Sequence, residues 1–249
     1  MRTKISLSAW GVFLAAELLL SGCAQPSPAP VAGPDPRYQV GAVLFADDFQ
    51  RDSGQWSTEL EKGGRVVIGG GKMEIDVPGG CTVWFRPEIT GPVMIEYDAT
   101  VLQAGGANDR VSDLNCFWMA QDARSPGDIF ATRRSGQFAD YDQLLCYYVG
   151  QGGNSNTTTR FRRYIGVADN RPLLPENDLH DAEFLLRPNL KQHLQLVACG
   201  GLIQYYRDGK KIFELNDPAP YTHGWFALRT TWNHMIVENF EVRKLSQVK

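Results

Sequence analysis

Three arginines and a tyrosine lie close together in residues 157–164 (TTTRFRRY). If this segment is a strand, its side chains alternate between two faces, and Arg160, Arg162 and Tyr164 share one of them. Guanidinium groups at positions i and i+2 of a strand lie about 7 Å apart, and their planar forks suit carboxylates. The pattern therefore indicates a site for a carboxylate-bearing ligand such as a uronate sugar.

Two positive charges beside Tyr164 would favour its phenolate form, which a base for β-elimination needs. In that reaction a base removes the proton α to the uronate carboxyl group, while cations or amides neutralise the developing enolate. Tyr164 is therefore the candidate base, with Arg160 and Arg162 as neutralising groups. The alternative is a structural strand whose arginines pair with Asp and Glu on neighbouring strands, and both interpretations stay open.

Asn115 and His234 are the other two candidate catalytic residues. On a strand over residues 114–120, Asn115 points into a groove if the more apolar, opposite face belongs to the core. Its amide would then bind a hydroxyl or carboxyl oxygen; the alternative is a buried Asn satisfied by the protein itself. His234 is the histidine best suited to act as a general base, with an ordinary surface histidine as the alternative.

Loops supply three candidate substrate-binding residues, Arg134, Tyr141 and Asn154. The first two lie in a long connection, residues 125–143, and a connection of that length in a compact domain is usually functional or disordered. Asn154 lies in a glycine-rich hairpin loop that we place at the rim of the domain.

Aromatic side chains are candidates for stacking on a sugar ring. Tyr147 and Tyr148 lie on opposite faces of one strand, so one of them is core and the other is available; Tyr147 is taken as the candidate. Four tryptophans compete for the same role, although most tryptophans in sandwiches are core: Trp84, Trp118, Trp225 and Trp232.

Several catalytic patterns are missing from the sequence. It has no Glu-x-Asp-x-x-Glu strand of a retaining glycosidase, no Gly-x-Ser-x-Gly elbow and no HExxH zinc motif. We expect no cofactor and name no metal-binding residue. A calcium ion held by Asp47, Asp48 and the C-terminal strand, in a stabilising role, is the one exception that this kind of fold would suit.

These residues must be positioned by strands. Short alternating runs separated by glycine-rich turns follow one another from Val43 onward, roughly a dozen of them, without a sustained helical stripe. Asp208-Gly209 between two such runs predicts a tight hairpin. The sequence predicts an all-β, two-sheet antiparallel β-sandwich of the jelly-roll type.

The N-terminus carries an export signal. Arg2 and Lys4 precede an apolar run too short to span a bilayer, and Leu20-Ser-Gly-Cys23 is the pattern of a bacterial lipoprotein cleavage site. We predict a signal peptide over 1–22, a lipidated Cys23 with a proline-rich tether over 23–37, and one β-sandwich domain over 38–249. For a Gram-negative host, Ala24 after the lipidated cysteine favours the outer membrane over the inner one. The lipid anchor is the only membrane contact that we expect, and the periplasmic or surface side stays open.

The amino-acid composition excludes one class of function. The chain has 249 residues, 28 acidic and 25 basic, for a net charge of −3, so a generally basic nucleic-acid binder is excluded. Four cysteines follow Cys23, and their disulfide state stays open: Cys81, Cys116, Cys146 and Cys199.

The order of sequence segments along the chain resembles that in domains of the concanavalin-like lectin/glucanase fold. The opening Phe45-Ala-Asp-Asp-Phe49 and the closing Gly224-Trp-Phe and Val237-Glu-Asn-Phe-Glu-Val242 carry that likeness. The middle is similar to an uncharacterised bacterial family related to YesU, which is associated with rhamnogalacturonan degradation. The matching elements are Val83-Trp-Phe-Arg-Pro87, Asn115-Cys-Phe-Trp-Met-Ala120, Asp128-Ile-Phe130, Arg134-Ser-Gly-Gln-Phe138 and Arg160-Phe-Arg-Arg-Tyr164.

Residue types and resemblance together predict an envelope-anchored, carbohydrate-active protein acting on acidic, pectic-type polysaccharide or its fragments. A polysaccharide lyase is the enzymatic form of this prediction. Three alternatives stay open. The first is a non-catalytic glycan-binding lipoprotein, and the second is an enzyme that cleaves modified (3-keto) glycosides, a chemistry that the resemblance to related sandwich families implies. The third is a purely structural envelope lipoprotein, which ion-paired arginines would favour.

Overall fold

The computed structural model describes residues 31–248. The predicted signal peptide and Cys23 lie outside these residues. The strands are β1 (Val31–Ala32), β2 (Tyr38–Asp47), β3 (Trp56–Leu60), β4 (Arg65–Gly69), β5 (Lys72–Phe85), β6 (Ile89–Thr90), β7 (Val93–Val101), β8 (Leu114–Asp122), β9 (Leu144–Gly152), β10 (Thr158–Ile165), β11 (Asp178–Leu179), β12 (Gln192–Cys199), β13 (Leu202–Arg207), β14 (Lys210–Asn216) and β15 (His223–Gln247).

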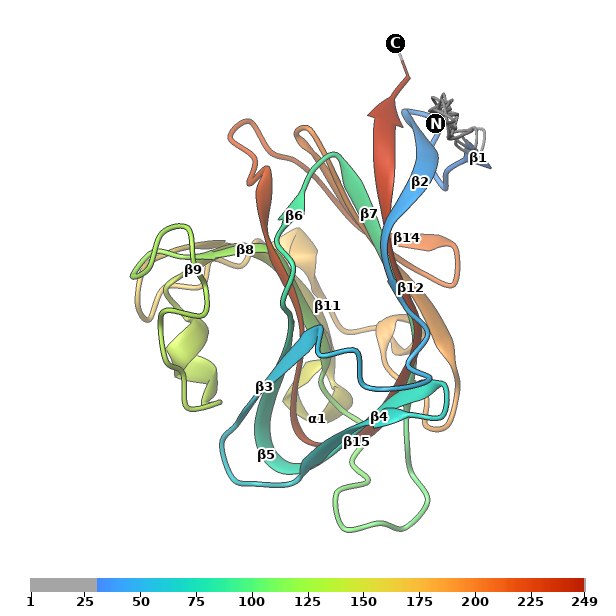
Figure 1. The fold of residues 1–249 in the computed structure, drawn as a ribbon, viewed down its shortest axis with the longest axis vertical. Coiled ribbons are helices and arrows are strands. Elements are labelled where there is room, and N and C mark those ends of the chain that lie inside the picture. Colours follow the sequence, from blue (N-terminus) through green and yellow to red (C-terminus); the bar gives the residue numbers. More distant parts are fainter. Residues whose placement is uncertain (1–30, 249) are drawn as a thin grey trace, which may run out of the picture.

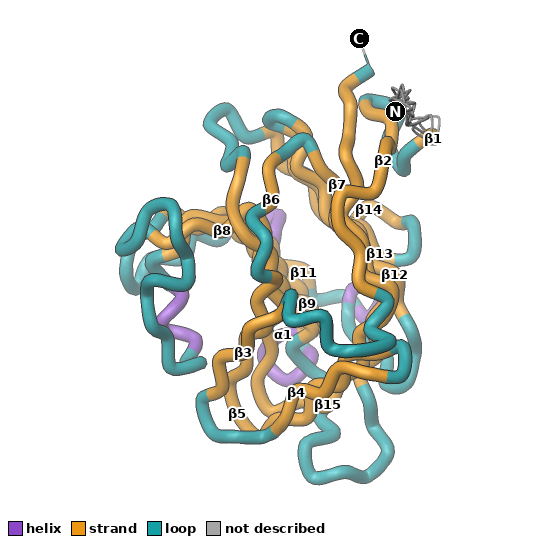
Figure 2. Tube along the Cα trace, in the orientation of Figure 1, coloured by secondary structure: helices purple, strands orange, loops and turns teal. Residues whose placement is uncertain are grey.

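Helical structure is confined to single turns between strands (Figure 2). They are η1 (Phe138–Tyr141), α1 (Gly153–Asn156), η2 (Pro175–Asn177) and η3 (Ala182–Phe184). Within residues 31–248, none of the helices has the length and apolarity needed to span a bilayer.

The long strand β15 belongs to both sheets of the sandwich (Figure 1). Its first half pairs with β5 on one side and β8 on the other, and its second half pairs with β2 and β7. The first sheet therefore continues from β15 through β8, β9 and β10 to β11, and the second through β7, β12 and β13 to β14. All these pairs are antiparallel, so the predicted antiparallel β-sandwich is confirmed.

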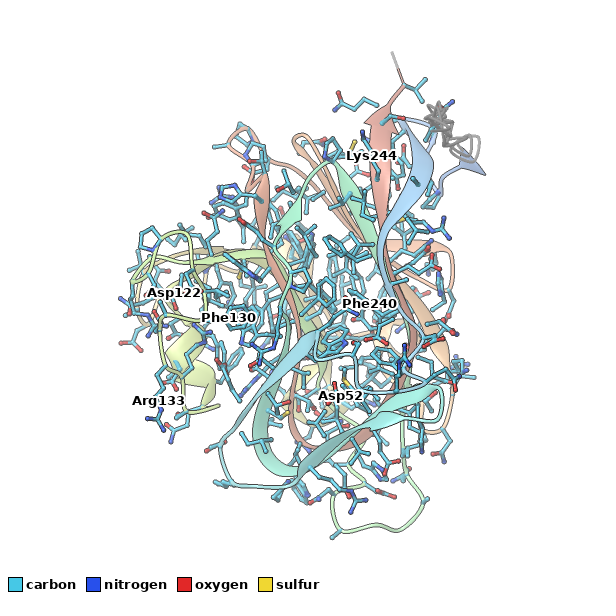
Figure 3. All side chains as sticks on the ribbon, viewed as in Figure 1. Asp52, Asp122, Phe130, Arg133, Phe240 and Lys244 are labelled. Atoms are coloured by element: carbon cyan, nitrogen blue, oxygen red, sulfur yellow. The ribbon has the colours of Figure 1, made fainter. Side chains whose placement is uncertain are left out.

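The main core fills the space between the two sheets. In β7 (VMIEYDATV), Ile95, Tyr97 and Ala99 are buried while Glu96 and Asp98 alternate with them on the outer side. The inward aromatic side chains include Trp118, Tyr147, Phe161, Phe226 and Phe240, and Figure 3 places Phe240 at the centre of the molecule. Burying each such side chain contributes roughly 1.5–3 kcal/mol.

A second, smaller core lies on the outer face of the first sheet. Residues 123–143 fold back over this face, so that Ile129 and Tyr141 pack against Trp84 and Phe117. The rings of Phe117 and Tyr141 are stacked with centroids 5.6 Å apart. The loop predicted to carry function therefore covers part of the face that carries the candidate residues.

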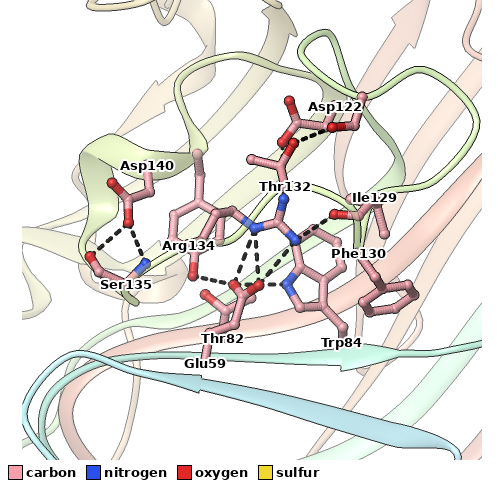
Figure 4. Close-up of polar contacts among 12 residues, drawn as sticks. Glu59, Thr82, Trp84, Asp122, Ile129, Phe130, Thr132, Arg134, Ser135 and Asp140 are labelled. Carbon is pink, nitrogen blue, oxygen red and sulfur yellow. Dashed lines mark hydrogen bonds and ion pairs between the residues drawn. The ribbon is translucent and has the colours of Figure 1, made fainter.

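Arg134 holds this loop in place (Figure 4). Its buried guanidinium pairs with Asp122 at 2.9 Å and with Glu59 at 3.0 Å, and it donates to the carbonyl of Ile129. Tyr141 is also fully buried and donates a 2.6 Å hydrogen bond to Glu59. Arg134 and Tyr141, which the sequence predicted to contact substrate, are therefore covered by protein and have their polar groups satisfied by it.

The four described cysteines are buried and unpaired: Cys81, Cys116, Cys146 and Cys199. Burial raises the pKa of the Cys81 and Cys116 thiols to about 12.

Candidate functional site

Four neighbouring strands bring polar groups into one row on the outer face of the first sheet. Arg229 on β15 lies opposite Asn115 on β8, which lies opposite Gly150 on β9, and Gly150 lies opposite Arg160 on β10. Directly paired residues have their side chains on the same face of a sheet. Arg229, Asn115 and Arg160 therefore form a polar floor, with Gly150, which has no side chain, between Asn115 and Arg160.

The next row along the same face consists of two aromatic residues and Arg162. Phe117 lies opposite Tyr148, and Tyr148 lies opposite Arg162. Phe138, from the loop that covers this face, packs against Tyr148 with ring centroids 5.8 Å apart. Tyr148 and Phe138 thus form an aromatic wall beside the polar floor.

Floor and wall enclose a groove made of two adjoining cavities, of about 500 Å³ and about 170 Å³. Both cavities are lined by Asp113, Phe138 and Tyr148. The larger cavity is also lined by Gly150, Gly153, Asn154, Thr158, Arg160, Arg162, Asp169 and Arg171. The smaller one is also lined by Glu61, Asn115, Arg229 and Thr231.

A left-handed turn closes the rim of the groove between β9 and β10. Asn154, Ser155 and Asn156 all have φ between 52° and 60°, a conformation that asparagine tolerates better than most residues. The Asn156 side chain fixes the turn, because its amide donates to the Leu186 carbonyl and its oxygen accepts from the Leu186 amide.

Two of the four arginines that line the groove, Arg160 and Arg171, have acidic partners. Arg160 forms two hydrogen bonds to Asp178, at 2.8 and 3.0 Å, and Arg171 pairs with Asp142 at 3.2 Å. Arg162 donates to the backbone carbonyl of Arg171, but no carboxylate of residues 31–248 lies within 4 Å of it. Its partial burial lowers the pKa of the guanidinium. Arg162 is therefore a partly desolvated cation in the groove that lacks an acidic partner in the described chain.

The smaller cavity contains a buried arginine and an unsatisfied amide. Arg229 is 3% exposed and donates to the Gly136 carbonyl at 2.7 Å and to the Thr82 hydroxyl at 3.1 Å, without an ion pair in the described part of the chain. The Asn115 amide faces Asp113 at 3.4 Å, but its buried Oδ1 has no hydrogen-bond partner among residues 31–248. A buried acceptor left in this state costs about 1–3 kcal/mol, which a ligand hydroxyl donating to it would offset.

A family described as a domain of unknown function (DUF6250) matches residues 75–240, two thirds of the chain. The chain belongs to this family. The matched range contains every groove-lining residue except Glu61, so the groove lies within the DUF6250 domain itself. No curated protein matches the chain.

Solved structures share the fold at low identity. A protein of unknown function with a galectin-like fold from Bacillus subtilis is 15% identical with a TM-score of 0.66, over 85% of this chain and 100% of that one. The carbohydrate-binding module CBM66 from Bacillus subtilis is 13% identical, TM-score 0.50, over 76% and 96%. β-Agarase A from Zobellia galactanivorans is 12% identical, TM-score 0.54, over 87% and 96%. These likenesses confirm the jelly-roll fold.

The predicted bases of the DUF6250 domain do not reach the groove. Tyr164 is fully buried against Tyr148 and Cys146, and its burial raises the pKa of the phenol. This shift is opposite to the predicted one, because desolvation outweighs the nearby guanidinium charges. His234 hydrogen-bonds Asp109 at 2.8 Å and Glu74 at 3.4 Å, and it lines neither cavity.

The choice between Tyr147 and Tyr148 is also corrected. Tyr147 faces the main core and donates a 2.7 Å hydrogen bond to Asp217, whereas Tyr148 lines both cavities. The predicted residues that the structure does place at the groove are Asn115, Asn154, Arg160 and Arg162. Their part in binding or catalysis stays a prediction.

Sequence reasoning missed Asp113, Phe138, Arg171 and Arg229 as groove residues. Arg229 had a usable signal, because it is a charged residue inside the apolar run GWFALRTTW and such a residue must be paired or functional. No sequence pattern indicated Arg171 or Phe138 as groove residues, because both reach the groove from loops whose paths depend on the whole fold.

The calcium prediction finds no support in the geometry of its acidic residues. The Asp47 carboxylate already accepts hydrogen bonds from the Phe49 amide, the Ser53 hydroxyl and the Trp56 indole, at 2.8–3.0 Å. Nowhere in residues 31–248 do three or more His, Cys, Asp or Glu side chains form a metal-holding group. The carboxylate oxygens of Asp47 are therefore already bound by protein groups, and this region does not fit a calcium site.

Proposed function

We propose that this protein binds an acidic saccharide in the groove of its first sheet. The observation that carries the proposal is Arg162, a partly buried cation without an acidic partner in the described residues, paired across the sheet with the aromatic wall residue Tyr148. A uronate unit fits this pair, because its carboxylate would neutralise the guanidinium while its ring lies against the aromatic face.

The smaller cavity supports the same proposal. The unsatisfied Oδ1 of Asn115 would accept a hydrogen bond from a ligand hydroxyl, and the buried guanidinium of Arg229 would donate to a hydroxyl or carboxyl oxygen. Planar polar groups beside an aromatic wall are the chemistry that recognises a polyhydroxylated ring. The fold is also shared with a carbohydrate-binding module and with a β-agarase whose structure holds oligoagarose.

We place the protein at the cell envelope, held by the lipidated Cys23 and the proline-rich tether, where extracellular or periplasmic glycan is available. A pectic ligand and a role beside rhamnogalacturonan degradation, which the resemblance to the YesU family implies, are parts of this proposal. We favour binding over β-elimination, since the burial of Tyr164 and the position of His234 leave the predicted mechanism without its base.

Calorimetry with matched glycans tests the proposal. The full chain is titrated with oligogalacturonates and with the same oligomers after carboxyl reduction. We expect saturable binding of the acidic form and at least tenfold weaker binding of the reduced form. Arg162→Gln should remove this preference, whereas Arg133→Gln, which changes an exposed arginine outside the groove, should keep it. Equal affinity for both forms would overturn the acidic ligand, and no binding of either would overturn the proposal.

Absorbance at 235 nm in the same mixtures reports on catalysis. A rise would mark an unsaturated uronate and would establish elimination, with a base other than Tyr164. A flat signal with saturable binding supports the binding function.

A further inference from the structure

Trp232 is unusual among the tryptophans of this protein. It is 50% exposed, whereas the other four tryptophans of residues 31–248 are at most 7% exposed. Large aromatic side chains on an exposed surface stabilise folding little, so an ordered and exposed indole is a candidate contact for a ligand.

The backbone at Trp232 is strained. The pairing of β15 with β5 shifts register between Thr231 and Asn233, and Trp232 at this bulge has a φ of 43°. The left-handed conformation costs an ordinary residue about 1–2 kcal/mol and is rare for a bulky one. Such strain persists only where surrounding contacts impose it, and it often accompanies a functional site.

Residues 107–110 impose this conformation. The Arg110 guanidinium donates to the carbonyls of Trp232 at 3.0 Å and Thr231 at 2.8 Å, and the Trp232 indole N–H donates to the Ala107 carbonyl at 3.2 Å. The guanidinium also lies 5.3 Å from the centre of the indole ring. The ring is therefore fixed in place while half of its surface stays exposed.

The same arginine connects Trp232 to the groove. Its Nη2 donates to Asp113, which lines both cavities, and Thr231, the neighbour of Trp232, lines the smaller cavity. Trp232 thus lies one residue beyond the groove lining and shares a hydrogen-bonded support with it.

We propose that Trp232 is a stacking subsite that continues the groove, so that the preferred ligand is an oligosaccharide long enough to fill the groove and reach the indole. This inference rests on the proposed function. The apolar face of a sugar ring would lie on a preoriented indole, which loses little conformational entropy on binding. Units that occupy only the groove gain nothing from Trp232, so the contribution of this residue depends on chain length.

Titration with oligogalacturonates of two to eight units tests the length dependence. Trp232→Ala should weaken binding of the longest oligomers about fivefold to tenfold, the range expected for one aromatic contact, and should leave the shortest ligand that binds unchanged. Leu44→Ala is the matched control, because it truncates a similarly exposed apolar residue on β2 of the other sheet and should change neither.

Acrylamide quenching gives a second readout. In a full-length Trp10→Phe background, the quenchable fluorescence should belong to Trp232 and should disappear in Trp232→Phe. Long oligomers should protect it from acrylamide, and short ones should not.

The outcomes separate the two proposals. Saturable binding that Trp232→Ala leaves unchanged at every length, with no protection from acrylamide, would overturn the subsite while the groove stands. Absence of binding in the parent chain would overturn the proposed function and the subsite with it.

Discussion

The hydroxyl of Tyr148 lies directly over Gly150, two residues along the same strand, so that a Cβ atom built on Gly150 would be 2.7 Å from the Tyr148 oxygen. Real Cβ atoms essentially never approach another atom so closely, and one of the two must move if Gly150 gains a side chain. The missing side chain at Gly150 therefore sets the orientation of the aromatic wall of the groove.

We predict that Gly150→Ala lowers the affinity for saccharide at least fivefold by displacing the Tyr148 ring, while the domain stays folded. Tyr148→Phe removes the clashing oxygen, so the double variant should recover part of the affinity, and a double-mutant cycle measured by calorimetry should show coupling. Gly69→Ala is the control, because a Cβ there meets nothing within 4 Å. Additive effects of the two substitutions would contradict this account of the wall.

Arg134 should be a stability residue and not a binding residue. Its guanidinium is enclosed by Asp122, Glu59 and the Ile129 carbonyl. Arg134→Gln therefore leaves the Glu59 carboxylate without a cation, whereas Asp122 keeps its ion pair with Arg124. Removing one partner of a buried ion pair costs about 3–5 kcal/mol. Urea unfolding should show a loss of this size, against almost none for the exposed neighbour Arg133→Gln. A loss below about 1 kcal/mol would mean that the loop over residues 123–143 is held by its apolar contacts alone.

The sequence was sufficient for the fold and for four of the residues that line the groove. Alternation on one strand places Arg160 and Arg162 together whatever the rest of the chain does, and the face of Asn115 follows from the apolar residues on either side of it. Tyr147 and Tyr148 are neighbours on one strand and point to opposite faces, both of which are buried. The polarity of the surrounding residues therefore did not show which of the two faces the groove.

How deeply a side chain is buried, and which charged residue it pairs with, depend on contacts between distant parts of the chain. Tyr164 is buried because residues 123–143 fold over it and neighbouring strands enclose it, and Arg160 is neutralised by Asp178 on the neighbouring strand β11. Neither relation leaves a periodic signal in the sequence. A strand pattern therefore predicts which side chains share a face, but not which of them a loop will cover.

The loop that supports Trp232 should weaken in acid. Backbone amides of Gly106 and Ala104 donate to the Asp109 carboxylate, and together with His234 they lower its pKa to about 2. A carboxyl group with a pKa lowered by folding stabilises the folded state above its unfolded pKa, near 4, and this contribution is lost as the pH falls toward 2.

Asp109→Asn removes the titrating group and tests this directly. At pH 5 to 7 the variant should unfold at a lower temperature than the parent, because Asn accepts the two amide hydrogen bonds without a negative charge. As the pH falls from 4 to 2 the parent loses its advantage, so the two melting temperatures should converge. A constant difference down to pH 2 would show that Asp109 acts through shape and hydrogen bonding alone, with no contribution from its charge.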